Sequence, residues 1–318
     1  MVGQLVSLRR MAIAAGLCML ALPALAQAPA GYPANYGEIV AAAQKEGKLV
    51  VYATTDSASA EPLLQKFKSL YPFLQVEYND LNSTELYNRA ISEAAAGASG
   101  ADLLWSSAMD LQLKLVADKL ALTYASPESK ALPTWAVEDN QAYGTTLEPL
   151  VMVYNKRLLP ADAVPTSHAD LAKLIAAKPD VFKGKLTCYD SEKSGVGFLL
   201  STQDFINWPG YWDMMTEFGK AGAKYFTSAG AMMEKVGSGE HLLAYNIFGS
   251  YALLRQKKNA DLGIVYPKDY TLGLSRVAFI AKTAKHPAAG KLFLDFILSK
   301  DGQDIIANKA LLFSIRDD

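Results

Sequence analysis

The residues best placed to do chemistry are small hydroxyl and glycine residues at the starts of predicted helices. Ser194-Gly195-Val196-Gly197 follows a predicted strand and opens a helix, and its two glycines allow a ligand to approach the backbone closely. Free amides at a helix start attract carboxylate or phosphate groups. Tyr189 and Asp190 end the preceding strand and are expected to face the same space, whereas Lys193 is typical of a solvated surface charge. This segment is the first candidate for an anion-binding site.

Polar side chains at other predicted strand ends extend this candidate site. Ligands of α/β sheets bind beyond the carboxyl ends of the strands. By that rule, together with helix starts and the return crossing between lobes, the further candidate ligand-binding residues are Thr54, Thr55, Asp56, Ser57, Ser106, Ser107, Thr227, Ser228, Asn246, Ser250, Tyr251 and Arg276. The hydroxyl residues among them are equally suited to cap helices. Arg276 either clamps an oxyanion with its guanidinium or pairs with Asp269 or Glu148.

The three histidines, His168, His241 and His286, share no recognisable catalytic motif with a nucleophile. The sequence also lacks the serine elbow of α/β-hydrolases, the His-Glu-x-x-His zinc helix and the phosphate-binding loop of nucleotide hydrolases. Once a leader is removed, Cys188 is the only cysteine, which excludes an intrachain disulfide and a cysteine-based metal cluster. We therefore expect a protein that is not an enzyme and that holds no metal or cofactor.

The N-terminus has the organisation of a cleavable secretion signal. Arg9 and Arg10 precede an apolar run over residues 11–22, and small residues follow it. This pattern predicts cleavage after Ala26 or after Ala28, which makes residues 1–26 a signal peptide. The run is shorter than the roughly 20 apolar residues that a membrane helix needs. The mature chain is expected in the periplasm.

The charge balance argues against nucleic acid as a partner. Removing the leader takes away two arginines, so 31 − 2 = 29 basic residues face 32 acidic ones and the formal charge is −3. Binding to a phosphate backbone requires a clustered positive charge instead. The chain is 51% hydrophobic, which is ample for a large core. We expect it to act as a monomer.

Predicted strands alternate with predicted helices along the mature chain. The expected strands lie at 48–52, 75–78, 101–105, 143–155, 185–189, 242–246, 263–266 and 276–281. The expected helices lie at 36–46, 60–70, 83–96, 109–118, 167–177, 195–206, 211–221, 229–237, 250–257, 287–298 and 301–310. This alternation predicts an α/β fold with helix-covered, mostly parallel sheets. No linker separates two sequential domains, so the chain is expected to cross between two lobes more than once.

Several segments recur in one family in this order: KLVVY at 48–52, EPLVMVYNK at 148–156, YDSEKSGVG at 189–197, SGE at 238–240, AYN at 244–246, HPAA at 286–289 and FLDFILS at 293–299. Together they resemble the periplasmic binding proteins of ABC importers, in the branch around the ferric-ion-binding proteins. The resemblance implies two α/β lobes with mixed sheets, joined by a hinge of crossing strands, that close on a ligand in the cleft between them. It places residues 30–145 and 276–318 in one lobe and 146–275 in the other.

The sequence departs from the ferric-binding proteins where iron would be held. Those proteins place two adjacent tyrosines shortly after an asparagine like Asn246, but residues 246–251 read NIFGSY here. The first-lobe loop has Asp56 and Ser57 in place of the histidine of some of them. The departure favours a small anion, such as a phosphorylated, phosphonate or carboxylate compound, that is passed to an ABC permease in the inner membrane. Ferric iron and a ligand-sensing role with a receptor kinase are the alternatives.

Overall fold

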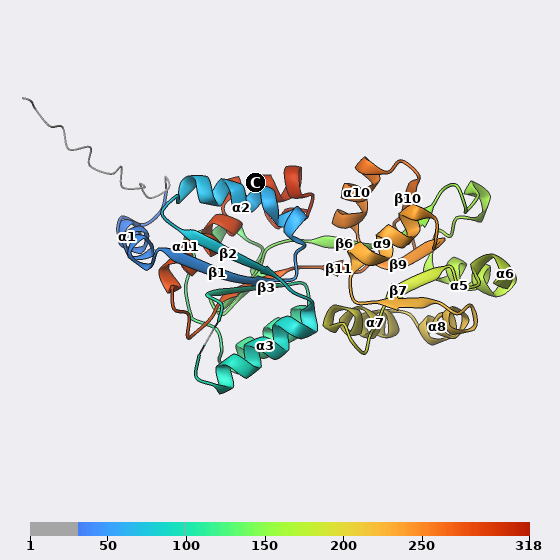
Figure 1. Ribbon diagram of the computed structural model, residues 1–318, viewed down its shortest axis with the longest axis horizontal. Coiled ribbons are helices and arrows are strands. Elements are labelled where there is room, and N and C mark those ends of the chain that lie inside the picture. Colours follow the sequence, from blue (N-terminus) through green and yellow to red (C-terminus); the bar gives the residue numbers. More distant parts are fainter. Residues whose placement is uncertain (1–30, 99) are drawn as a thin grey trace, which may run out of the picture.

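The computed structural model describes residues 31–98 and 100–318 of the chain (Figure 1). The predicted signal peptide and its cleavage positions, Ala26 and Ala28, lie outside these residues. Within the described ranges, no helix is long and apolar enough to cross a membrane. The described chain forms two lobes side by side, each built on a β-sheet with helices on its faces (Figure 1).

The sheet of the first lobe is mixed and takes its strands from both ends of the chain. Its strand order is β2 (Gln75–Asp80), β1 (Lys48–Ala53), β3 (Leu103–Ser106), β12 (Val277–Ile280), β5 (Ala142–Gly144) and β4 (Val137–Glu138). β1 runs parallel to β2 and β3, whereas β12 runs antiparallel to β3 and β5. The apolar strands β1 and β3 are buried almost throughout, as expected for strands covered on both faces.

Helices cover both faces of this sheet. They are α1 (Tyr36–Glu46), α2 (Ser57–Leu70), α3 (Ser83–Ala95), α4 (Met109–Ala117), α11 (Pro287–Leu298) and α12 (Lys300–Ile305). α11 packs against α1 on one side and against β1 and β12 on the other. Because it is apolar nearly all round, ten of its twelve residues are buried. Short helical turns lie at Pro127–Ala131 and Thr134–Ala136.

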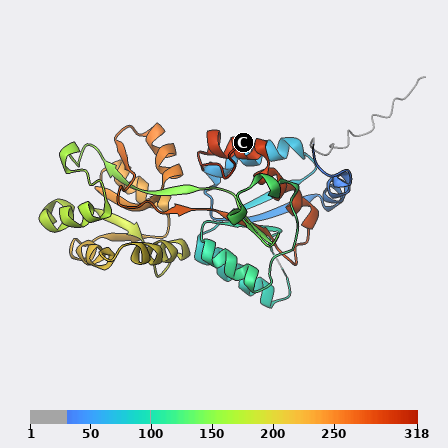
Figure 2. The same ribbon diagram turned by 180° about the vertical axis from the view of Figure 1, so that it is seen from behind.

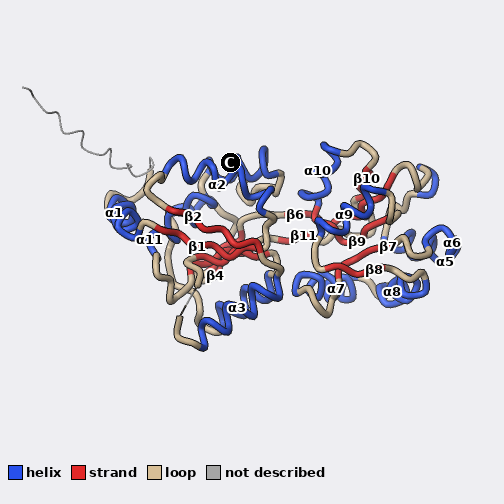
Figure 3. The backbone as a smooth tube through the Cα atoms, viewed as in Figure 1, coloured by secondary structure: helices blue, strands red, loops and turns tan. Residues whose placement is uncertain are grey.

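The second lobe has a sheet of its own. Its strand order is β10 (Leu262–Val265), β6 (Glu148–Asn155), β9 (Leu243–Phe248), β7 (Leu186–Tyr189) and β8 (Lys224–Phe226), and β11 (Gly273–Leu274) pairs with β6. Its helices are α5 (His168–Ala177), α6 (Pro179–Phe182), α7 (Gly195–Asn207), α8 (Tyr211–Lys220), α9 (Ala229–Ser238) and α10 (Gly249–Lys258). α7 and α8 lie on one face of this sheet, and α9 and α10 lie on the other (Figure 3).

Two neighbouring segments carry the chain between the lobes. One leads from β5 to β6 and the other from β11 to β12, and both run along the middle of the molecule (Figure 2). They are tied together, because the amide of Thr145 donates to the carbonyl of Arg276 at 2.8 Å and the amide of Arg276 donates to Thr146 Oγ1 at 2.9 Å. This is the hinge of crossing strands that the sequence predicted.

Most predicted elements are confirmed. The exceptions lie at the crossing between the lobes, near the C-terminus and at two short edge strands. The prediction of one strand over 143–155 is wrong, because β5 ends at Gly144 and β6 begins at Glu148, with the crossing between them. The predicted helix over 301–310 is also interrupted. α12 ends at Ile305, and a π-helical turn follows and ends at Leu311, whose φ is +58°. The edge strands β4 and β8 were not predicted, because they are too short to show a period.

Candidate ligand-binding cleft

A cavity of about 140 Å³ lies between the two lobes, where strand ends and helix starts of both lobes meet. Its wall on the first lobe is formed by Thr54, Asp56, Asp80, Leu81, Asn82, Ser83 and Ser107. Its wall on the second lobe is formed by Tyr189, Val196, Thr227, Ser228, Ala229, Phe248 and Tyr251, and Arg276 borders it at the crossing. This is the position at which α/β sheets bind ligands.

The start of α7 is engaged by the first lobe. The amide of Gly195 donates to Thr84 Oγ1 at 2.9 Å, and the amide of Val196 donates to Ser83 Oγ at 3.0 Å. Thr84 Oγ1 in turn donates to the carbonyl of Lys193 at 3.0 Å. In this arrangement of the lobes, the amides predicted to hold an anion hold the start of α3 instead.

The start of α9 is the helix start that remains open to the cavity. Ser228 Oγ accepts a hydrogen bond from the amide of Ala231 at 3.5 Å. The amides of Ala229 and Gly230 belong to the first turn, so they have no acceptor within the helix, and in the described chain no other acceptor is paired with them. They and the partial positive charge of the helix end are available to a negative group.

Asp56 faces this helix start from the other lobe. A Cβ atom placed on Gly230 would lie 3.7 Å from Asp56 Oδ2. The amide of Asp56 donates to the hydroxyl of Tyr251 at 3.0 Å, which links the two lobes. Burial raises the pKa of Asp56, the carboxylate of Asp80 raises it further, and the guanidinium of Arg276 opposes the rise. Asp56 therefore holds its proton more tightly than an ordinary aspartate.

Arg276 is fully buried beside the cavity and is paired with Glu148. Its Nε donates to Glu148 Oε1 at 2.7 Å, its Nη2 to Oε2 at 3.3 Å and its Nη1 to Thr55 Oγ1 at 3.0 Å. The hydroxyl of Ser250 donates to the same carboxylate. Of the two roles predicted for Arg276, the structure shows the ion pair with Glu148, and Asp269 pairs with His168 instead, at 2.8 Å.

The chain is similar to known proteins over most of its length. A family model of bacterial extracellular solute-binding proteins matches residues 62–317. The chain belongs to this family. The solute-binding protein was also compared with curated proteins, and no match was found.

Solved structures support the same assignment. The substrate-binding protein of an ABC transporter from Agrobacterium tumefaciens is 36% identical, with a TM-score of 0.83 and coverage of 85% of this chain and 80% of that chain. AfuA from Actinobacillus pleuropneumoniae, with fructose-6-phosphate bound, is 20% identical, with a TM-score of 0.74 and coverage of 84% of both chains. Iron-bound HitA from Pseudomonas aeruginosa is 22% identical, with a TM-score of 0.70 and coverage of 85% of this chain and 87% of that chain. The last two likenesses show the fold alone.

The cleft of the solute-binding protein brings together about half of the predicted ligand residues. Those that line it are Thr54, Asp56, Ser107, Tyr189, Val196, Thr227, Ser228, Tyr251 and Arg276. Those that do not line it are Thr55, Ser57, Ser106, Ser194, Gly195, Gly197, Asn246 and Ser250. Most residues of this second group form hydrogen bonds with other parts of the protein, and the sequence does not show these bonds. The hydroxyl of Ser57, for example, donates to Asp80 at 3.2 Å, and Ser106 Oγ accepts from the amide of Ala108 at 3.2 Å.

Asn246 is directed away from the cleft. Its backbone is in the left-handed region, with φ of +58°, and its side-chain amide donates to Asp204 Oδ2 at 2.6 Å.

The cleft also contains residues that were not predicted from the sequence, and they are Asp80, Leu81, Asn82, Ser83, Ala229 and Phe248. Asp80 ends β2 and the next three residues follow it, so the rule of strand ends would have found all four had it been applied to that strand.

Two of the three histidines of the solute-binding protein are paired with an aspartate. His168 Nδ1 lies 2.8 Å from Asp269 and its ring stacks on Tyr270 with centroids 4.0 Å apart. His286 Nδ1 lies 2.9 Å from Asp102. The buried Nδ1 of His241 has no hydrogen-bond partner among the described residues, and its ring lies 5.8 Å from that of Phe226, centroid to centroid. Among the described residues, no cluster of three or more histidine, cysteine or acidic side chains has the arrangement of a metal site. Burial raises the pKa of the Cys188 thiol to about 12.

Proposed function

We propose that this solute-binding protein captures a small solute between its lobes in the periplasm and delivers it, as a monomer, to an ABC permease in the inner membrane. The family match and the 36% identical substrate-binding protein of an ABC transporter support this role. The lobes in this proposal are residues 30–145 with 276–318, and residues 146–275. The composition of the two sheets supports this division.

We further propose that the solute is a small anion that also carries hydrogen-bond donors. The observation that carries this proposal is the open start of α9, where Thr227, Ser228 and two free amides border the cavity. Such a helix start suits a carboxylate or a phosphate. Asp56 and Asp80 line the same small cavity, and their carboxylates suit hydroxyl or ammonium groups of the solute. A phosphorylated or carboxylated compound with hydroxyl or amino groups meets both requirements.

A carboxylate of the protein already lies close to the proposed position of the anion. Asp56 lies opposite the start of α9, and its negative charge would repel a bound phosphate or carboxylate. Burial raises the pKa of Asp56, which reduces this repulsion relative to an ordinary aspartate, and the protonated carboxyl group donates a hydrogen bond to an anion. The same carboxyl group, when ionised, accepts from an ammonium of the solute.

A thermal-shift screen of the mature protein, starting at Gln27, tests the proposal. The panel contains inorganic phosphate, phosphonates, sugar phosphates, amino and hydroxy acids and ferric ion, with citrate measured both alone and as ferric citrate. A ligand at 100 times its dissociation constant adds about 2.7 kcal/mol of stability. We expect a shift with an anion of the panel and no chemical change of that compound. A response to ferric ion alone, with the colour of a tyrosinate complex, would contradict the anion, and product formation would contradict a binding role.

A further inference from the structure

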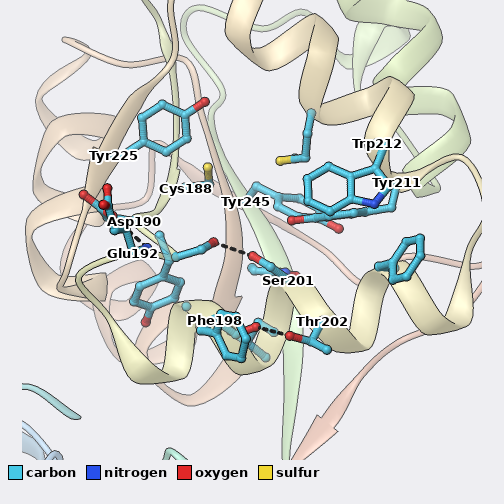
Figure 4. Close-up of a pocket in the computed structure, with 17 residues that line it drawn as sticks. Cys188, Asp190, Glu192, Phe198, Ser201, Thr202, Tyr211, Trp212, Tyr225 and Tyr245 are labelled. Carbon is cyan, nitrogen blue, oxygen red and sulfur yellow. Dashed lines mark hydrogen bonds between the residues drawn. The ribbon is translucent and has the colours of Figure 1, made fainter. Parts of the chain in front are cut away.

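A second and larger cavity, of about 640 Å³, lies within the second lobe (Figure 4). It is bounded by α7, α8 and the ends of β7, β8 and β9. Small-molecule pockets have volumes of roughly 300–1,000 Å³. The cavity between the lobes, at about 140 Å³, is much smaller. The proposed transport function does not account for this second space.

Aromatic rings form much of its wall. Tyr225 stands on one side, Trp212 and Tyr211 stand on the other, and Phe198 on α7 lies below, between the two sides (Figure 4). Phe198 and Trp212 are each 58% exposed, and Tyr225 is 49% exposed. Rings of this size gathered around one hollow leave an apolar patch in contact with water, and such patches mark binding sites.

The charge of this cavity is negative. Asp190 and Glu192 lie on the side of Tyr225, and no lysine, arginine or histidine is among the described residues that line the space. Lys193 contacts Asp190 at 3.4 Å, but its side chain is 71% exposed and it is not among the residues that line the cavity. Burial raises the pKa of Asp190, yet hydrogen bonds from the amides of Lys193 and Glu192 outweigh this and lower it. Asp190 is therefore ionised at neutral pH.

Hydrogen bonds fix the polar part of the cavity. The hydroxyls of Ser191 and Ser201 are 2.6 Å apart, so the loop after β7 is tied to α7 (Figure 4). The hydroxyl of Tyr245 donates to the buried Asp204 at 2.9 Å. The segments that carry the aromatic and acidic side chains are therefore held in place before a ligand binds. This reduces the conformational entropy that the protein loses on binding.

We propose that this cavity of the second lobe is a separate binding site for an organic cation with an aromatic or apolar body. The ammonium group lies on the side of Tyr225, where Asp190 balances its charge, and the aromatic or apolar body packs against Trp212 on the opposite side. Aromatic faces and a nearby carboxylate are the groups that recognise quaternary ammonium ions. An anion, which we propose for the cleft between the lobes, finds no positive side chain here.

Titration calorimetry with benzyltrimethylammonium tests this site, and phenylmethanesulfonate, with the same benzyl body and a negative charge, is the control ligand. We expect one cation per protein and no binding of the sulfonate at the same concentrations. Trp212→Ala removes a ring contact with the benzyl body and is expected to weaken cation binding about fivefold. Asp190→Asn removes the partner charge of the ammonium and is expected to weaken it by a similar factor, about fivefold. Trp135→Ala removes a 55% exposed tryptophan of the first lobe and is expected to bind the cation as the wild type does.

Three results would overturn the proposal: no saturable binding of the cation, equal binding of the sulfonate, or unchanged affinity in Trp212→Ala. A cation bound between the lobes would instead be lost in Asp56→Asn and retained in Trp212→Ala. Because Trp212 does not line the cleft between the lobes, Trp212→Ala should keep its response in the thermal-shift screen. The two proposals can therefore fail independently.

Discussion

At the scale of single residues, the pair of Arg276 and Glu148 joins the hinge to the cleft. Both side chains are almost inaccessible to water and are hydrogen-bonded to each other, to Thr55 and to Ser250. The rings of Phe248 and Tyr251 lie about 5 Å from the guanidinium. A buried ion pair of this kind fixes one geometry, and it is costly to break from one side only.

Glu148→Gln tests this pair. The substitution leaves the charge of Arg276 buried without its counterion, and we expect a loss of about 3–5 kcal/mol in the free energy of unfolding. Chemical denaturation measures the loss. Glu77→Gln, which removes the acid of the exposed Lys48–Glu77 pair, is the matched control and should hardly change the transition midpoint. Equal effects of the two substitutions would contradict the importance of the buried pair.

The buried carboxyl group of Asp295 predicts how the free energy of unfolding changes with pH. Burial raises its pKa to about 6, against an ordinary 3.8, although Tyr36, Tyr124 and Ser126 donate hydrogen bonds to it. The folded protein therefore keeps this proton when the unfolded chain has lost it, so Asp295 costs stability as pH rises through 4 to 6. We expect the stability of Asp295→Asn relative to wild type to rise by roughly 3 kcal/mol between pH 4 and pH 7. Parallel pH profiles of the two proteins would contradict the raised pKa.

At the scale of elements, the helix starts decide how the lobes meet. α3 of the first lobe and α7 of the second meet end to end, and Ser83 and Thr84 accept hydrogen bonds from the first amides of α7. Each such bond contributes about 1 kcal/mol. The arrangement of the two lobes seen here is thus stabilised by hydrogen bonds between them.

Thr84→Val tests this contact, because it removes the acceptor for Gly195 and the donor to the carbonyl of Lys193 while keeping the side-chain shape. We expect a larger radius of gyration in small-angle X-ray scattering and an affinity for the cleft ligand that is weaker by about fivefold. Thr216→Val, which removes only a bond within α8, is the control. A variant that scatters and binds as the wild type does would show that these bonds do not hold the lobes together.

The sequence predicted elements well where the local pattern and the tertiary environment agree. α1 covers the predicted residues 36–46. Its apolar spacing is that of a helix, and Gly47, with φ of +65°, ends it. The strand over 143–155 was predicted as one piece, because its β-branched and aromatic residues continue through the crossing. What divides it is the bond between Thr145 and Arg276, which are 131 residues apart and give no local signal.

At the scale of the whole molecule, the site could be predicted only in part. Strand ends indicated the edge of both sheets that the cavity between the lobes borders, and Thr54 and Ser107 were selected by that rule. Ser228 was selected as a helix start, because the short strand before it was not predicted. The rule does not predict which helix starts form hydrogen bonds with the opposite lobe and are therefore not available to a ligand. Ser194 and Gly195 were the strongest sequence candidates, but the way the lobes close brings α3 onto them.

The most direct test of capture between the lobes is a calorimetric titration of the anion that the thermal-shift screen selects, in wild type and in two variants from opposite lobes. Ser107→Ala removes a hydroxyl from the first wall and Ser228→Ala one from the second. Binding of one anion per protein, weakened in both variants by about fivefold for each lost hydrogen bond, is the result we predict. Wild-type affinity in both variants, or the absence of any binding anion, would contradict a ligand held between the two lobes.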